Sequence, residues 1–134
     1  DSRLGRTARA HPVWLLHGPM AADAARDAWL ATGATLAQVR ETDGQLDLAD
    51  ALHALAAKGL TRILVEGGST LGAALLRAGL VDDLALFAGA ALIGAEGHPA
   101  LGPLGLTALA KAPRPTLRET QVLGADLYSL WSLS

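Results

Sequence analysis

The chain has 134 residues, of which 51% are hydrophobic and 18% are charged, and its 11 Lys and Arg residues against 13 Asp and Glu residues give a formal net charge of −2. These values predict one folded globular domain and exclude both a disordered chain and the concentrated basic surface that nucleic-acid binding requires. The absence of Cys excludes a disulfide framework, a thiolate nucleophile and thiolate metal ligands.

Strands and helices alternate over the first two thirds of the chain. Short apolar runs that end in turn residues predict strands, and apolar residues spaced by three or four predict helices. In chain order, the predicted elements are a strand over 12–17, a helix over 21–32, a strand over 35–40, a helix that Asp47 caps and Lys58-Gly59 ends, a strand over 61–66, a helix over 70–78 and a strand over 83–88. Helical crossovers of this length predict right-handed parallel connections.

The last third of the chain has a different pattern. Residues 94–105 contain glycine at 94, 97, 102 and 105 and proline at 99 and 103, which predicts an irregular loop and a candidate lid. Alternating residues over 116–122 and 126–133 predict two strands joined at Gly124-Ala125 as an antiparallel hairpin. The predicted fold class is therefore α/β, with a mostly parallel sheet flanked by helices and a C-terminal antiparallel hairpin.

Membrane and metal binding are not indicated by the sequence. No apolar run approaches the ~20 residues of a membrane-spanning helix, and residues 1–4 lack the apolar core of a secretion signal. We therefore expect a cytoplasmic protein with no membrane partner. No metal is expected either, because metal-ligand spacing is absent among the four His residues, His11, His17, His53 and His98.

Candidate binding residues follow the predicted parallel strands, because ligands of open α/β sheets bind beyond the carboxyl ends of the strands. These positions are His17-Gly18, Arg40-Glu41 and the Glu-Gly-Gly-Ser-Thr sequence at 66–70. The last is the most informative. Its two glycines let the backbone approach a ligand closely, and Ser69 and Thr70 place hydroxyls and unpaired amides at a helix N-terminus, where a phosphate is favoured.

The same segment leaves alternatives open. It is neither a nucleoside triphosphatase loop nor a hydrolase nucleophile elbow, because Ala73-Ala74 replaces Lys-Ser/Thr of the former and Leu71 replaces the last Gly of the latter. A purely structural turn with Ser69 as the helix cap fits the spacing as well. Glu66 directly follows an apolar run, so we expect its carboxylate to be satisfied by an Arg ion pair or by N–H and O–H groups of a ligand.

Longer stretches of the sequence resemble one known family. VEGGSTL at 65–71, followed by LRAGLVDDL at 76–84, is similar to the reductase domain of bifunctional riboflavin-biosynthesis deaminase/reductase proteins. DSRL at 1–4, LIG at 92–94 and GADL at 124–127 extend the similarity over essentially the whole chain. The resemblance implies a dihydrofolate-reductase-like fold and use of NADPH to reduce the ribosyl group of 5-amino-6-(5-phosphoribosylamino)uracil to a ribityl chain.

The resemblance also implies roles for particular residues. Glu66 matches the substrate-contacting carboxylate of the family, and Ser2 matches a cofactor contact. The NADPH-binding segment matches Gly68, Ser69, Thr70, Leu71, Gly72, Ala73 and Ala74. No covalent nucleophile or other catalytic side chain is assigned, since the cofactor supplies the hydride and the protein aligns it with the substrate. His17 stands where relatives often carry Thr or Ser.

The first part of the family pattern is not found in this sequence, which starts at Asp1. Members begin with a strand and a helix and then a segment resembling Asp-Asp-Pro-x-Leu-Thr, which together provide most contacts to the substrate phosphate. We therefore expect residues 1–134 to form a single but incomplete reductase domain, without the zinc deaminase domain. A sheet that lacks its first strands exposes an apolar edge, and the relatives suggest a homodimer.

Two other functions remain open at this point. The first is a dihydrofolate-reductase-like oxidoreductase that acts on another pyrimidine or a pterin. The second belongs to a different class, a non-catalytic nucleotide-binding or oligomerisation module in which the glycine turn is only structural. Comparing the turnover rate on the ribosylaminopyrimidine with the turnover rate on dihydrofolate distinguishes the riboflavin-pathway reductase from the first alternative. Titration with NADPH tests the second alternative.

Overall fold

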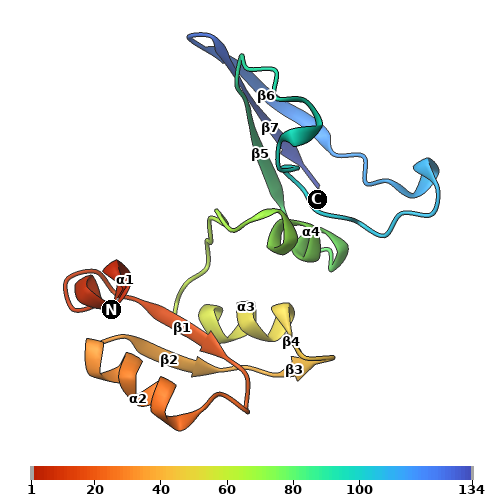
Figure 1. The fold of residues 1–134 in the computed structure, drawn as a ribbon. Coiled ribbons are helices and arrows are strands. Elements are labelled where there is room, and N and C mark those ends of the chain that lie inside the picture. Colours follow the sequence, from red (N-terminus) through yellow and green to blue (C-terminus); the bar gives the residue numbers. More distant parts are fainter. Residues whose placement is uncertain (1, 134) are drawn as a thin grey trace. The chain divides into compact units, whose positions relative to one another are not determined.

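The computed structural model describes residues 2–133 of the chain. They fold as two compact units, Asp1–Ile63 and Leu64–Ser134 (Figure 1), and each unit is described by itself. The part of the DSRL similarity that falls on Asp1 lies outside the described residues.

The first unit contains a strand–helix–strand motif. Its elements are α1 (Arg3–Thr7), β1 (Trp14–His17), α2 (Asp23–Thr32), β2 (Thr35–Gln38), β3 (Glu41–Thr42), β4 (Gln45–Leu46) and α3 (Leu48–Ala56). β1 and β2 pair in parallel, with α2 as the crossover, which confirms the predicted strands and helix in this region. Trp29 and Leu15 pack against a small buried cluster of Ala8, Val13 and Ala34, so the hydrophobic core of this unit lies between the helices and the parallel strand pair.

Local polar signals define where α3 begins. The Asp47 side chain accepts a 3.0 Å hydrogen bond from the Asp50 amide, as predicted for a helix cap. Before it, β3 and β4 form an antiparallel hairpin whose turn residues, Asp43 and Gly44, have positive φ angles of 53° and 72°. Both are residue types that tolerate this conformation at low cost.

We expect Asp47→Ala to lower the free energy of unfolding by about 1 kcal/mol, because the Asp50 amide loses its cap. Urea unfolding measures this, with Asp27→Ala as the control. Asp27 is an exposed carboxylate on α2, and its replacement is expected to cost less than about 0.5 kcal/mol. Equal stability of the two variants would show that the cap does not stabilise α3.

The second unit combines one helix with an antiparallel sheet. Its elements are α4 (Ser69–Arg77), β5 (Asp83–Ala88), the short 3₁₀ turns η1 (Gly94–Glu96) and η2 (Leu109–Lys111), β6 (Thr116–Leu123) and β7 (Asp126–Ser132). The strand order is β5-β7-β6, and both pairings are antiparallel. The predicted strand over 83–88 and the C-terminal hairpin are thereby confirmed, with Gly124 at φ 67° in the hairpin turn.

Two expectations about the sheet differ from the structure. The strand predicted over 61–66 is not formed: the segment crosses from the first unit to the second after Ile63, and neither part of it pairs with a strand of its own unit. Residues of high β propensity favour an extended chain, but a strand also needs a neighbour to pair with. A single, mostly parallel sheet is not confirmed either, since only β1–β2 is parallel among the pairings found in residues 2–133.

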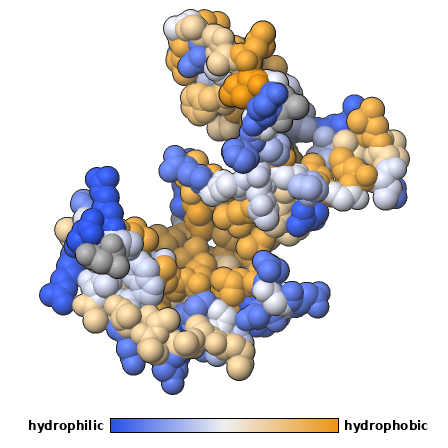
Figure 2. Space-filling view, in the orientation of Figure 1, coloured by the Kyte–Doolittle hydropathy of each residue, from blue (hydrophilic) through white to orange (hydrophobic). Residues whose placement is uncertain are grey.

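The antiparallel sheet leaves large apolar side chains in contact with solvent. Phe87 on β5 is 70% exposed and Val122 on β6 is 74% exposed. Figure 2 shows orange, apolar side chains, with blue, polar ones among them, over the sheet of the second unit. The Phe87 ring contacts the Tyr128 ring in a tilted arrangement, with a centroid separation of 5.1 Å and an interplanar angle of 47°, and Phe87 stays largely exposed despite this contact. Within residues 2–133, no helix has the length and apolar character that crossing a membrane demands.

Candidate functional site

The N-terminus of α4 carries unpaired backbone donors. The helix begins at Ser69, its cap residue is Gly68, and no side chain caps it. The first helical hydrogen bond runs from the Gly72 amide to the Gly68 carbonyl, at 3.2 Å. The amides of Ser69, Thr70 and Leu71 have no acceptor among the described residues, and the helix dipole adds partial positive charge there. This terminus is suited to an anionic group.

The alternative in which Ser69 acts as the helix cap is wrong, because Ser69 lies inside the helix and Gly68 occupies the cap position. Gly68 has φ −63° and ψ 172°, angles that any residue adopts. A Cβ atom built on Gly68 would meet no heavy atom within 4 Å. Neither backbone strain nor packing therefore explains glycine at 68, and the space in front of it is open to a ligand.

The neighbouring glycine has different surroundings. A Cβ atom on Gly67 would lie 2.6 Å from Cδ2 of Leu71, so the Leu71 side chain covers this position. The diglycine turn thus has one side occupied by the chain itself and one side open, at Gly68.

Glu66 precedes this turn with an exposed side chain. Within the second unit it forms no hydrogen bond or ion pair, so a structural ion pair with an Arg of that unit is not found. The expected cost of an unsatisfied carboxylate also does not arise, because water solvates the exposed group. The carboxylate is free to accept hydrogen bonds, two residues before the open glycine.

The other predicted cofactor residues lie along α4 and in the first unit. Ala73 is only 1% exposed, and a Cβ atom on Gly72 would lie 3.4 Å from Cδ2 of Leu101. The middle of α4 is thus covered by the loop that follows β5. Ser2 belongs to the first unit, where its hydroxyl accepts a 3.2 Å hydrogen bond from the Gly5 amide and caps α1. The structure brings residues 66–74 together and leaves Ser2 in a separate unit.

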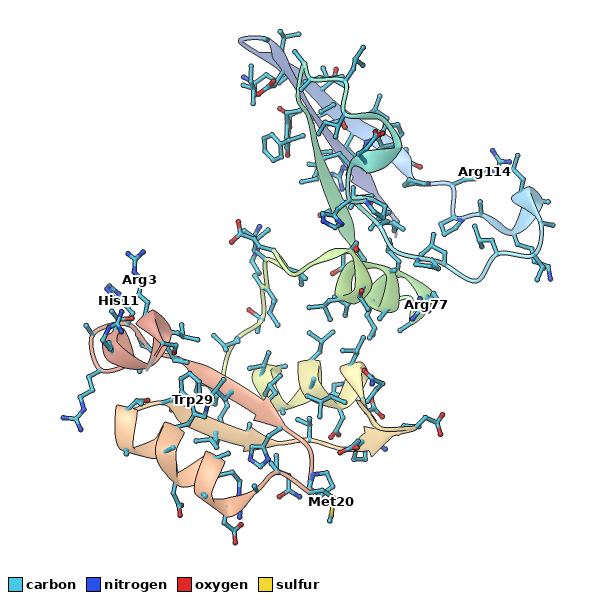
Figure 3. All side chains as sticks on the ribbon, in the orientation of Figure 1. Arg3, His11, Met20, Trp29, Arg77 and Arg114 are labelled. Atoms are coloured by element: carbon cyan, nitrogen blue, oxygen red, sulfur yellow. The ribbon has the colours of Figure 1, made fainter. Side chains whose placement is uncertain are left out.

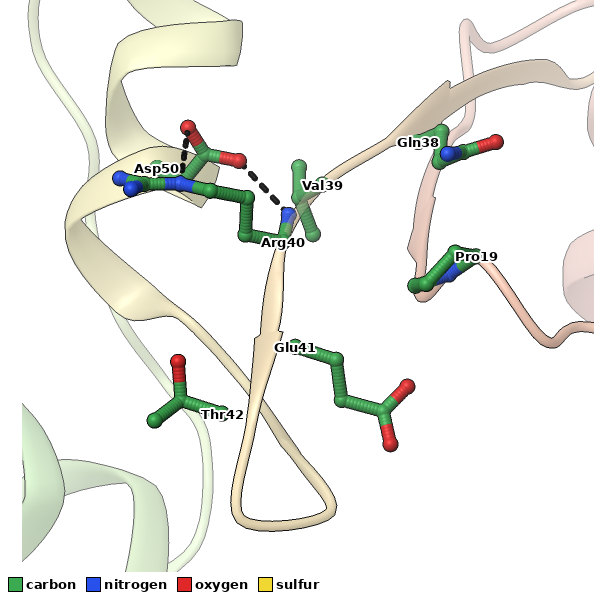
Figure 4. Close-up of a pocket in the computed structure, with 7 residues that line it drawn as sticks. All are labelled: Pro19, Gln38, Val39, Arg40, Glu41, Thr42 and Asp50. Atoms are coloured by element: carbon green, nitrogen blue, oxygen red, sulfur yellow. Dashed lines mark hydrogen bonds and ion pairs between the residues drawn. The ribbon is translucent and has the colours of Figure 1, made fainter.

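A cavity of about 430 Å³ lies in the first unit beyond the carboxyl ends of β1 and β2 (Figure 4). Its lining residues are Pro19, Gln38, Val39, Arg40, Glu41, Thr42 and Asp50. Sequence reasoning named Arg40-Glu41 at this place but missed Asp50, because the contact between a strand end and a later helix leaves no local signal.

The positive charge of Arg40 in this cavity is balanced by two carboxylates of the chain itself. Its guanidinium lies 3.4 Å from an Asp47 carboxylate oxygen and 3.2 Å from one of Asp50, and its amide donates a 2.7 Å hydrogen bond to Asp50. This backbone hydrogen bond, with the charge of Arg40, lowers the pKa of Asp50. Two carboxylates around one cation make the cavity a poor phosphate site.

Metal binding finds no support in the side chains that are described. No group of three or more His, Cys, Asp or Glu residues is placed to hold a metal ion in residues 2–133. His17 has a local partner, with its ring Nδ1 2.9 Å from the Gly18 carbonyl oxygen.

The fold and the start of α4 define an α/β protein with a helix terminus suited to anions. The chain belongs to the RibD C-terminal domain family, which residues 7–129 match. It is 37% identical over 93 residues to the riboflavin biosynthesis protein RibD of Chlamydia pneumoniae, covering 69% of this chain and 24% of that protein. It is 32% identical over 84 residues to the 2,5-diamino-6-ribosylamino-4(3H)-pyrimidinone 5′-phosphate reductase of Methanothermobacter thermautotrophicus, covering 62% of this chain and 39% of that protein.

A solved structure of RibD from Acinetobacter baumannii has the same fold, with a TM-score of 0.73 and 19% identity over 98% of this chain and 34% of that one. These comparisons confirm the family resemblance and the α/β fold of RibD-type reductases. The chain spans about a quarter of the Chlamydia relative and 39% of the archaeal one.

Proposed function

We propose that this chain forms the cofactor-binding part of an NADPH-dependent reductase of riboflavin biosynthesis. The reaction is reduction of the ribosyl group of 5-amino-6-(5-phosphoribosylamino)uracil to the ribityl group. The observation that carries the proposal is the start of α4, where three amides without acceptors follow an open glycine in a chain of the RibD C-terminal domain family.

The residues at this terminus fit a dinucleotide cofactor. The amides of Ser69, Thr70 and Leu71 are donors for phosphate oxygens, and the absence of a side chain at Gly68 gives the pyrophosphate room to approach. A Cβ atom at Gly68 would occupy that open space. Gly72, Ala73 and Ala74 belong to the proposed segment on the family resemblance alone, since Leu101 and Gly102 cover Gly72 and Ala73. Ser2 is a further contact on the same ground. NADPH, when bound, supplies a hydride to the substrate.

Glu66 is the proposed substrate contact. Its exposed carboxylate accepts hydrogen bonds from N–H and O–H groups of the pyrimidine compound, which holds the ribosyl carbon in place for reduction. No residue of the chain is assigned a covalent or proton-transfer step, and no metal is assigned.

Two pyrimidine compounds come into question as the substrate. The relative from Methanothermobacter is named for a 2,5-diamino-4(3H)-pyrimidinone substrate, whereas the other relative is named RibD. The identity to RibD is higher, so we propose the aminouracil as substrate. The two compounds differ in one ring substituent, and a reductase assay with both distinguishes them.

Assembly and location complete the proposal. Exposed apolar side chains on the sheet of the second unit, such as Phe87 and Val122, support burial against a second copy as a homodimer.

We further propose that residues 1–134 are part of one reductase domain, because the family match runs from 7 to 129 across both units. We also propose a cytoplasmic location.

The proposal is tested with protein expressed from the complete reading frame that encodes this chain. We expect oxidation of NADPH, followed as loss of absorbance, when the aminouracil ribosyl phosphate is added. Dihydrofolate is expected to react at least about tenfold more slowly, since it lacks the ribosyl phosphate of the proposed substrate. The relative rates with the aminouracil and the diaminopyrimidinone show which of these two is the substrate. Faster turnover of dihydrofolate would favour a reductase of another substrate. Saturable binding of NADPH with no turnover of any of the three would favour a non-catalytic nucleotide-binding module.

A further inference from the structure

A short segment of the loop after β5 runs along α4. We call residues 101–103 the strap. The Gly102 amide donates a 3.0 Å hydrogen bond to the Ser69 carbonyl, and Cδ2 of Leu101 lies 3.4 Å from the position of a Cβ atom on Gly72. The Pro103 carbonyl accepts a 2.6 Å hydrogen bond from the guanidinium of Arg77. Figure 3 shows Arg77 on α4, near the end of the helix.

Close approach explains why residue 102 is glycine. A Cβ atom there would lie 3.2 Å from the Ser69 carbonyl oxygen, 3.4 Å from the Ser69 carbonyl carbon and 3.6 Å from Cβ of Ala73. The first two contacts are with backbone, which cannot rotate away as a flexible side chain does. Any side chain at 102 therefore moves the strap or the first turn of α4.

The strap acts on a helix that has no cap of its own. No side chain caps α4 at Gly68, and a short helix without a cap frays at its first turn. The hydrogen bond from Gly102 holds the carbonyl of Ser69, the first residue of that turn, and Arg77 ties the strap to the last turn. The covered Ala73, 1% exposed, lies beneath Gly102. Because the Ser69 carbonyl and the Thr70 amide belong to one planar peptide group, the hydrogen bond from Gly102 restrains the direction of the Thr70 amide.

We infer that Gly102 is a positioning residue for cofactor binding, through its hydrogen bond to Ser69 and its close contact with the first turn of α4. The inference rests on the proposed function, since the turn it positions is the proposed phosphate-binding turn. Donors that are already ordered bind a phosphate without the entropy cost of ordering them. Gly102 itself needs no contact with the cofactor.

The experiment compares Gly102→Ala with Gly89→Ala in protein expressed from the complete reading frame. Gly89 lies just after β5 in the same unit, and a Cβ atom there meets its nearest neighbour, Oδ1 of Asp126, at an ordinary 3.7 Å. We expect G102A to raise the dissociation constant and the KM of NADPH about tenfold, because the phosphate donors lose their preorganisation, with the KM of the pyrimidine substrate and kcat at saturating NADPH within about twofold. G89A is expected to change none of them.

Two further measurements make the result decisive. Arg77→Ala adds no atoms and frees the other end of the strap, so it is expected to raise the KM of NADPH in the same direction even if G102A does not fold. Hydrogen exchange of the Gly72 and Ala73 amides is expected to accelerate in both strap variants, with or without cofactor.

An NADPH affinity unchanged in a folded G102A, or unchanged in R77A where G102A does not fold, overturns the inference. Equal losses in the KM of NADPH, the KM of substrate and kcat also overturn it, because they indicate a general structural role. If the unaltered protein does not bind NADPH, the proposed function fails. Hydrogen exchange then tests separately whether the strap orders the first turn of α4. Unchanged exchange of the Gly72 and Ala73 amides in G102A and R77A would reject that ordering role.

Discussion

Gly68→Val should weaken NADPH binding by about tenfold or more, because overlap of an added side chain with a bound group costs about 1–3 kcal/mol. A Cβ atom at 68 meets nothing within 4 Å in the chain itself, so the added side chain fills space that the proposal reserves for the pyrophosphate. The φ of −63° at this position is open to valine. The free energy of unfolding should therefore fall by only about 1 kcal/mol, the difference between glycine and valine as a helix cap.

Fluorescence of the Trp residues during NADPH titration measures the affinity, and urea unfolding measures the stability. Gly68→Ala is the graded control, since it adds one carbon and is expected to give a smaller loss of affinity. Unchanged affinity in a folded G68V would remove Gly68 from the cofactor site.

Glu66→Gln should impair the use of substrate far more than the binding of cofactor. A hydrogen bond to a charged group is worth about 1.5–3 kcal/mol, which corresponds to roughly a 10- to 100-fold fall in kcat/KM for the pyrimidine substrate. The dissociation constant of NADPH should stay within about twofold, since the phosphate donors are backbone amides that the substitution leaves in place.

The matched control for this substitution is Glu119→Gln, an exposed carboxylate on β6. Steady-state kinetics and NADPH titration of both variants separate the two effects. A larger loss of cofactor affinity than of substrate turnover in E66Q would show that the carboxylate is assigned to the wrong ligand.

Elements with local signals were predictable from the sequence. Asp47 as a cap, Asp43-Gly44 as a turn and Gly124 in the hairpin each act through residues next to them in the chain. Helix α1 (Arg3–Thr7) was missed although its cap, Ser2, precedes it directly. Five residues give too little periodicity for an apolar face to be recognised.

The failure at residues 61–66 has a different cause. Ile63, Leu64 and Val65 favour an extended chain, yet they are 43%, 80% and 43% exposed and unpaired. Propensity describes one segment, whereas pairing depends on strands elsewhere in the chain. The same limit applies to the antiparallel pairing of β5 with β7, since the sequence predicted both strands but not their partnership.

In the candidate site, too, features formed by neighbouring residues were predictable from the sequence, and contacts between distant segments were not. The glycine pair followed by a helix predicted unpaired amides at 69–71, because both features are contiguous. The strap was predicted only as an irregular loop, since its hydrogen bond joins residues 69 and 102. The Arg40 and Asp50 pair was missed for the same reason. Contacts between distant segments appear only when the chain is folded.

The central claim is that the first turn of α4 binds the phosphates of NADPH. The most direct measurement is amide NMR of ¹⁵N-labelled protein from the complete reading frame, titrated with NADPH. We expect saturable shifts that are largest at the amides of Ser69, Thr70 and Leu71, with the amide protons moving downfield as they donate to phosphate. Saturable shifts centred on the cavity around Arg40 and Asp50, with no change at 69–71, would contradict it.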